Sequence, residues 1–171
     1  MAAILKLDTI QTSNGLGVIT SPNKIVYPGA VLQTVQSLIP GASDVSKSTI
    51  LSTTSTSYSS IVYKSITTTA ANSKFLITAS TVAYNGTAER GSTRLVRDST
   101  VLDSNQYAMY DQGGVFVFHQ FTVLDSPNVA AGTTLTYYYQ GRSFTGAVVN
   151  FGYGDGAGGP GAQITIMEIA Q

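Results

Sequence analysis

The feature that most constrains this chain is a succession of short runs rich in β-branched and aromatic residues, each closed by turn-forming residues. Roughly eight or nine such runs follow residue 29, and none has the period of an amphipathic helix. The runs lie at residues 31–38, 58–67, 74–84, 93–97, 100–102, 115–124, 133–140, 147–151 and 162–170. Many short strands with frequent turns are typical of an antiparallel β-sandwich, and their number predicts a jelly roll.

The composition agrees with an all-β fold and excludes several classes of function. The 171 residues include 22 Thr, 19 Ser and 10 Tyr but only two Glu, which excludes a helical bundle. Charged residues make up 11% of the chain, and 9 basic residues balance 9 acidic ones, so no basic stripe is present for a nucleic acid. The absence of cysteine excludes disulfides and thiolate metal sites. Because the chain shows neither a secretory signal nor an apolar run of about 20 residues, we expect a soluble protein without a membrane segment.

Residues 1–28 differ in character from the rest of the chain. Their apolar residues are dense but fall in short pieces, which are separated by turn residues at 13–17 and 21–23. Pieces this short bury too little surface to form a core of their own. We therefore predict an extended arm at 1–28 that lies along another surface, and a β-sandwich knob at 29–171. A disordered tail is the alternative for the first segment.

Two of the expected strands are apolar on both faces. In the run at 115–124, Phe116, Phe118 and Leu124 alternate with a second apolar set, and the last run is similar. A strand that faces water on one side should carry polar residues there, so we expect a second copy of the chain to cover the extra apolar face. The arm folded back over that face is the alternative. The predicted interface between copies consists of Val115, Val117, Phe121, Val123, Ile164 and Ile166.

The chain offers few residues for catalysis or metal binding. The single histidine, His119, lies within an apolar strand and is expected to be a packed, hydrogen-bonded residue. No G-x-S-x-G elbow and no suggestive pair of Glu residues occurs, so we predict a protein that is not an enzyme and has no metal or cofactor. Residues 152–161 contain a G-x-G-x-x-G match, but a strand rather than a helix follows it, which excludes a phosphate-binding loop.

The charged and tyrosine-rich stretches leave two interpretations open. Residues 89–98 hold the densest charges, and Arg94 and Arg97 are expected on opposite faces of a hairpin that turns at Asp98 and Ser99. Either a surface ion-pair network or a partner contact would account for this cluster. In the run at 133–140, Tyr137 and Tyr139 share one face and Tyr138 takes the other. Tyrosines suit interfaces that stay partly wet and also suit stacking against sugars.

Several stretches resemble virion proteins of tailed phages. They are residues 4–11 (ILKLDTIQ), 28–36 (PGAVLQTVQ), 52–58 (STTSTSY), 73–77 (SKFLI), 124–128 (LDSPN) and 164–170 (ITIMEIA). These strand edges and turns are spread over nearly the whole chain and contain no catalytic residue. The resemblance implies a jelly-roll knob similar to the heads of C1q and tumour necrosis factor, usually trimeric, in proteins labelled tail fibre, capsid fibre or decoration protein.

Pattern and resemblance together predict a homotrimeric appendage on the virion surface, made in the host cytoplasm, of the capsid decoration (cement) or head-fibre type. The residues expected to dock the arm on capsid or tail proteins, by strand addition or as apolar pegs, are Ile4, Leu5, Leu7 and Ile10. Loops near 85–90, 107–114 and 152–161 are expected at an exposed tip. The candidate contacts there are Asn85, Glu89, Arg90, Tyr153 and Asp155. A short tail fibre or tail tip that binds host surface glycans is the alternative, and a glycan-active enzyme is a more distant one.

Overall fold

A computed structural model describes residues 28–40, 51–84, 90–110, 116–152 and 160–171. These residues form strands, turns and loops, and none of them builds a helix long and apolar enough to cross a membrane. The strands are β1 (Val31–Pro40), β2 (Leu51–Thr53), β3 (Ser59–Thr67), β4 (Lys74–Tyr84), β5 (Arg90–Arg97), β6 (Thr100–Tyr110), β7 (Phe116–Asp125), β8 (Thr134–Ser143), β9 (Val149–Phe151) and β10 (Pro160–Ile169).

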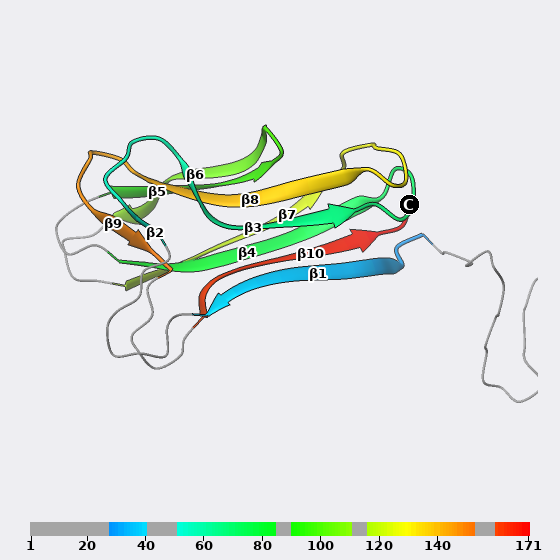
Figure 1. The fold of residues 1–171 in the computed structure, drawn as a ribbon, viewed down its shortest axis with the longest axis horizontal. Coiled ribbons are helices and arrows are strands. Elements are labelled where there is room, and N and C mark those ends of the chain that lie inside the picture. The colour runs from blue at the N-terminus through cyan, green and yellow to red at the C-terminus, as the bar shows by residue number, and fades with distance from the viewer. Residues whose placement is uncertain (1–27, 41–50, 85–89, 111–115, 153–159) are drawn as a thin grey trace, which may run out of the picture.

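The strands pair in a nested series that defines a jelly roll. The hairpin β5·β6 is the innermost pair, and β4·β7, β3·β8, β2·β9 and β1·β10 follow outward, all antiparallel. Such a series is one long two-stranded ribbon, and rolling it up adds the lateral pairs β10·β4 and β5·β8. Sheet A has the order β1-β10-β4-β9-β2 with β7 also on β4, and sheet B has the order β3-β8-β5-β6. Figure 1 shows the two sheets stacked face to face, which confirms the predicted all-β antiparallel sandwich.

The core lies between the two sheets because the strands alternate. Successive side chains of a strand point to opposite faces. In β4 this places Phe75 and Ile77 between the sheets, and in β8 it places Tyr137 and Tyr139 there, all fully buried. Tyr138 is only half-buried and takes the opposite face. The predicted division of the three tyrosines between the faces is therefore confirmed.

One contact between the sheets depends on a glycine. A Cβ atom at Gly141 of β8 would lie 2.6 Å from the nearest ring carbon of Phe151 in β9. The buried Phe151 ring therefore packs directly against the backbone of the opposite sheet, and a side chain at position 141 would force the two sheets apart.

The two ends of the sandwich differ in the segments that they join. At one end the Gly29 N–H donates to the Ala170 carbonyl and the Ala170 N–H to the Ala30 carbonyl, both at 2.9 Å. We call this the arm end, because the predicted arm precedes residue 29. At the opposite end, called the far end, β8 finishes at Ser143 beside β2 and β9 (Figure 1). The predicted arm, apart from Pro28, lies outside the described residues and stays a prediction.

Candidate functional site

The outer face of sheet A carries large apolar side chains. On β7, Phe116, Phe118 and Leu124 are 50%, 60% and 56% exposed. Phe116 lies opposite Tyr84 of β4 with ring centroids 5.0 Å apart, and Leu124 lies opposite Leu76. Single exposed apolar residues are ordinary, but several on one sheet face make that face a candidate contact surface. We call these five residues the apolar face of sheet A.

Neutral polar residues cross the middle of the same surface. The antiparallel register aligns Thr122 of β7 with Thr78 of β4, and Thr78 with Thr165 of β10. The next row aligns Gln120 with Ser80 in the same way. Ser80 is buried, but the exposed side chains of Thr122 and Gln120 can form hydrogen bonds with a partner without the cost of burying a charge.

The structure corrects the predicted interface between copies. Phe121, Ile164 and Ile166 are at most 6% exposed and lie in the core of a single copy, so the prediction that they contact another copy is wrong. Val117 and Val123 are half-buried and pack against the same core, whereas Val115 lies outside the described residues. The alternation along β7 was predicted correctly, but both of its faces are apolar. Alternation alone does not say which face points inward.

The outer face of sheet B is polar by contrast. The hydroxyl groups of Ser65 in β3 and Thr136 in β8 are 2.9 Å apart across the strands. Two positions closer to the far end, Tyr63 lies opposite Tyr138, and the two rings stack with centroids 5.7 Å apart. Tyr63 is 59% exposed, so the pair presents an aromatic platform to solvent.

Toward the far end, the same face of sheet B carries two arginines next to Tyr58. The guanidinium carbons of Arg94 and Arg142 lie 4.1 Å and 4.6 Å from the centroid of the Tyr58 ring, within the range of cation–π attraction. A 2.7 Å hydrogen bond with the Ser92 hydroxyl fixes the Tyr58 hydroxyl. Arg94 also donates from Nε to the Gln140 side-chain oxygen at 2.7 Å. We call Tyr58, Arg94 and Arg142 the arginine cluster.

Neither arginine of this cluster has a carboxylate partner among the described residues, where the ion pair is that of Arg97 with Asp125. Arg142 donates from Nη1 to the Thr56 carbonyl at 3.3 Å, and its buried Nε has no hydrogen-bond partner. Sequence reasoning missed the cluster, because Arg142 stands among neutral residues in the chain. The alternate outward positions 138, 140 and 142 were the signal that could have indicated it.

Arg97 points to the other side of β5, as its spacing from Arg94 predicted. Its Nη1 donates to Asp125 Oδ2 at 2.6 Å, and the Tyr137 hydroxyl donates to the same oxygen at 2.8 Å. Asp125 belongs to sheet A and is 7% exposed, whereas the other two residues belong to sheet B. Burial and the hydrogen bond to Asp125 raise the pKa of Tyr137 above its ordinary value. The three side chains therefore connect the two sheets through hydrogen bonds and an ion pair.

His119 also points between the sheets. Its Nδ1 lies 2.8 Å from the Tyr139 hydroxyl and 3.2 Å from the Thr93 hydroxyl, and its ring meets Phe121 edge-on at 4.8 Å. Burial lowers the pKa of His119 more than the carboxylate of Asp103 raises it. This environment agrees with the packed, hydrogen-bonded histidine that the sequence predicts.

Glu168 is fully buried at the arm end of β10. Its carboxylate accepts hydrogen bonds from Gln33 Nε2 at 2.7 Å and from the backbone N–H groups of Thr69 and Ala70 at 2.9 Å and 3.2 Å. Burial alone would raise the pKa of Glu168, but these bonds and one from Ser73 hold it below its ordinary value. The carboxylate thus joins β1, β10 and the loop between β3 and β4.

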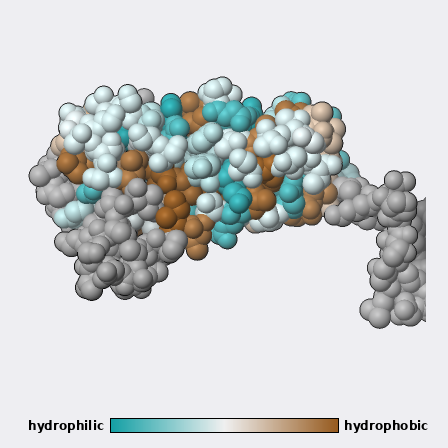
Figure 2. All heavy atoms as spheres, in the orientation of Figure 1, coloured by the Kyte–Doolittle hydropathy of each residue, from teal (hydrophilic) through white to brown (hydrophobic). Residues whose placement is uncertain are grey.

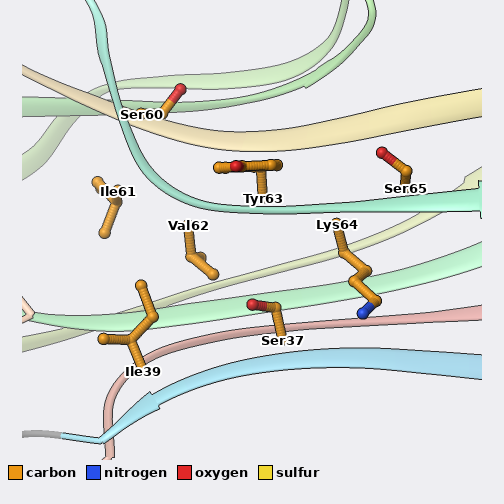
Figure 3. Close-up of a pocket in the computed structure, with 8 residues that line it drawn as sticks. All are labelled: Ser37, Ile39, Ser60, Ile61, Val62, Tyr63, Lys64 and Ser65. Atoms are coloured by element: carbon orange, nitrogen blue, oxygen red, sulfur yellow. The ribbon is translucent and has the colours of Figure 1, made fainter.

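A groove of about 520 Å³ lies along the side of the sandwich where the edge strands β1 and β3 face each other. It is lined by Ser37 and Ile39 of β1 and by residues 60–65 of β3. Figure 3 shows Ile39 and Val62 approaching each other across it, whereas Tyr63 points away toward the outer face of sheet B. Figure 2 shows apolar residues gathered on this side of the molecule. The groove offers aliphatic contact, hydroxyl groups and the Lys64 amine.

Most of the predicted docking and tip residues lie outside the described residues. Outside are Ile4, Leu5, Leu7, Ile10, Asn85, Glu89, Tyr153 and Asp155. Arg90 is described and begins β5 at the far end, where its carbonyl accepts from the Phe144 N–H at 2.8 Å. In the described part of the chain, no group of three or more His, Asp or Glu side chains is placed to hold a metal ion.

No family model and no curated protein sequence matches this chain. Among solved structures, dimeric latent PorU from Porphyromonas gingivalis is similar with a TM-score of 0.53 and 13% identity, over 94% of this chain and 14% of that one. The infectious bursal disease virus VP2 subviral particle is similar with a TM-score of 0.39 and 14% identity, over 91% of this chain and 42% of that one. The chain therefore spans less than two thirds of either neighbour. The similarity to PorU shows a shared fold and nothing about function. The similarity to VP2 is too low to indicate either.

Proposed function

We propose that this chain is a non-enzymatic structural protein of a virion, a trimeric surface appendage of the capsid decoration or head-fibre type. Its arm, residues 1–28, docks on the particle, and its knob, residues 29–171, projects from the surface. The observation that carries the proposal is the apolar face of sheet A, which one copy leaves exposed. The resemblance of the strand edges and turns to phage virion proteins supports the same assignment.

The chemistry of the apolar face suits contact with further copies of the chain. Burying exposed apolar surface is favourable by about 25 cal/mol per Å². Among the outward positions of β4 and β7, the charged residue is Lys74, at the arm end of the face. A contact through this face therefore buries aromatic and aliphatic side chains and a neutral polar band, with little cost from desolvated charge.

Cyclic symmetry would give such an assembly a direction. In a threefold ring all copies point the same way along the axis. Knobs that pack through their apolar faces around an axis along the strands would present three arm ends on one side and three far ends on the other. Three arms could then dock on one particle site, and repetition would add avidity to weak contacts at the far ends.

Light scattering after size-exclusion chromatography tests the trimer. We expect a particle of about three times the 17.9 kDa chain mass. A variant without residues 1–28 should keep that stoichiometry but fail to bind particles that lack the protein. A monomeric full-length chain would contradict the trimer, and a truncated variant that still binds particles would contradict docking by the arm.

A second candidate function follows from the outer face of sheet B, where Tyr63 and the arginine cluster lie toward the far end. In this alternative the protein is a short tail fibre or tail-tip receptor-binding protein that recognises host surface glycans. Antibody labelling of intact particles separates the two. Label over the head supports a decoration or head-fibre protein, and label confined to the tail supports the receptor-binding alternative.

A further inference from the structure

We infer that the outer face of sheet B binds an acidic glycan at the far end, with a sugar carboxylate held by Arg94 and Arg142 and the chain of sugars laid over the Tyr63–Tyr138 platform. This inference rests on the second candidate function above, and it adds the charge class of the ligand and the residues that read it.

The positive charge of the site is uncompensated among the described residues. Arg94 donates a hydrogen bond from Nε to the neutral side chain of Gln140, and Arg142 donates from Nη1 to a backbone carbonyl at 3.3 Å. Each guanidinium has five N–H donors, so both keep donors for a ligand. A carboxylate matches the planar fork of a guanidinium better than any neutral group does, because two parallel charge-assisted hydrogen bonds can form.

The cluster is held in place before any ligand arrives. Both guanidinium groups lie within 4.6 Å of the Tyr58 ring centroid, and the Tyr58 hydroxyl is bonded to Ser92 of β5. Gln140 further fixes Arg94. Long side chains that are already ordered lose less conformational entropy on binding, so the site gains affinity from its preorganisation.

The neighbouring residues extend the site along the sheet. Tyr138, Gln140 and Arg142 occupy alternate outward positions of β8, so they cover about 13 Å of strand. Tyr63, which is 59% exposed and stacks on Tyr138, lies at one end of this row, and the arginine cluster lies at the other. An aromatic surface beside a cationic one suits a ligand with an apolar ring face and an anionic substituent, which describes a uronic acid within a glycan.

Other occupants fit this face less well. A nucleic acid would need several phosphate contacts along a basic stripe, and a chain whose 9 basic residues are balanced by 9 acidic ones gives such binding little electrostatic support. The acidic residue nearest in the β5·β6 register, Asp103, lies opposite the inward-facing Leu95, so it belongs to the other face of the sheet from Arg94. Among the described residues, no carboxylate occupies the cluster, as a site for an external carboxylate requires.

The test uses the full-length protein and two immobilised polymers, polygalacturonate and neutral dextran. We expect at least tenfold tighter binding to polygalacturonate, with an affinity that falls as salt rises. The double variant Arg94→Gln/Arg142→Gln should lose at least tenfold of that affinity. The control Lys64→Gln removes one positive charge from the groove between β1 and β3, on the opposite side of β3 from Tyr63, and should stay within twofold of the parent protein.

The outcomes separate this inference from the functions on which it depends. Equal binding of both polymers, or a double variant that binds polygalacturonate as the parent does, overturns the acidic-glycan site. If Tyr63→Ala then abolishes binding of both polymers, glycan recognition stands without selection by charge. Absence of binding to either polymer overturns both the inference and the receptor-binding alternative. Light scattering and thermal unfolding of the same samples report the trimer and the fold independently.

Discussion

The two outer faces of the sandwich follow the same strand alternation but carry opposite chemistry. On sheet A, Phe118 and Leu124 are 60% and 56% exposed beside a band of neutral threonine and glutamine. On sheet B, the corresponding positions carry hydroxyl pairs, stacked tyrosines and two arginines that lack a carboxylate partner among the described residues. A sandwich that works as a monomer needs only polar outer faces. The difference is the basis for our proposal that sheet A contacts other copies of the chain and that sheet B faces the solvent and its ligands.

The most direct way to break this comparison is Phe118→Asp on sheet A. The side chain points outward, so the core of one copy stays intact, but a charge enters the proposed contact between copies. We expect the trimer to dissociate, with a dissociation constant raised at least about 1000-fold, which corresponds to roughly 4 kcal/mol. Sedimentation velocity at several protein concentrations measures the effect.

Tyr63→Asp is the matched control on sheet B, because Tyr63 is 59% exposed and Phe118 60%. It introduces the same charge at an equally exposed aromatic position and should leave the trimer intact. A trimer that survives Phe118→Asp, or one that dissociates with Tyr63→Asp, would show that the apolar face of sheet A is not the contact between copies.

The second largest effect concerns the contact of Arg97, Asp125 and Tyr137 between the two sheets. Asp125→Asn leaves the Arg97 guanidinium without its countercharge in a site that is 18% and 7% exposed at the two side chains. Removing one partner of a buried pair costs about 3–5 kcal/mol, and we expect the lower part of that range because Arg97 retains some contact with solvent. Urea unfolding at fixed protein concentration measures the loss.

Asp103→Asn is the control for Asp125→Asn. Asp103 is an exposed carboxylate on the edge strand β6, and its removal should change the free energy of unfolding by no more than about 0.5 kcal/mol. Similar losses for the two variants would mean that Arg97 and Asp125 do not couple the sheets.

Acid should weaken the same inter-sheet layer. The pKa of His119 is lowered from 6.5 in the folded state, so below about pH 6.5 the unfolded chain binds more protons than the folded one. Stability is complete above that pH and falls as the pH drops, by at most about 1.4 kcal/mol per pH unit for one proton. Urea unfolding at pH 7.5 and 5.5 should show the loss in the parent protein, and His119→Gln should remove it.

Glu168 should cause a second loss of stability at lower pH, and His119→Gln should not change that loss. Its pKa is lowered from 4.5 in the folded state, so its contribution is present above about pH 4.5 and is lost as the pH falls further. If His119→Gln also removes the loss below pH 4.5, the two groups do not titrate as separate parts of the fold.

Strand positions were predictable because local chemistry decides them. The run at 74–84 coincides with β4, and the predicted turn at Asp98 and Ser99 joins β5 to β6 with Asp98 at a φ of 50°. Aspartate tolerates this left-handed conformation better than most residues, so the turn can be predicted from the sequence. The sides taken by Arg94, Arg97 and Tyr138 follow from the two-residue period in the same way.

The inward face of β7 and the arginine cluster were not predictable, for two different reasons. Both faces of β7 are apolar, so the choice between Phe118 and Phe121 is made by packing against the opposite sheet. Tyr58 and Arg142 lie far apart in the chain, and they meet because the loop before β3 returns to the end of β8. A pairing register, not a local pattern, brings such residues together.

The smallest effect sharpens the comparison of the faces themselves. Ser65 and Thr136 form an exposed hydroxyl pair on sheet B, and Leu76 and Leu124 form the equivalent cross-strand pair on sheet A. Within one copy, each pair should couple by about 0.2–1 kcal/mol in a double-mutant cycle of alanine variants. In the trimer the Leu pair should couple more strongly, because partner copies would cover it, whereas the Ser–Thr pair should not change. Double-mutant cycles measured in the parent protein and in the Phe118→Asp background therefore separate the coupling energy within one sheet from the energy of assembly. Equal couplings in both backgrounds would place the contact between copies elsewhere.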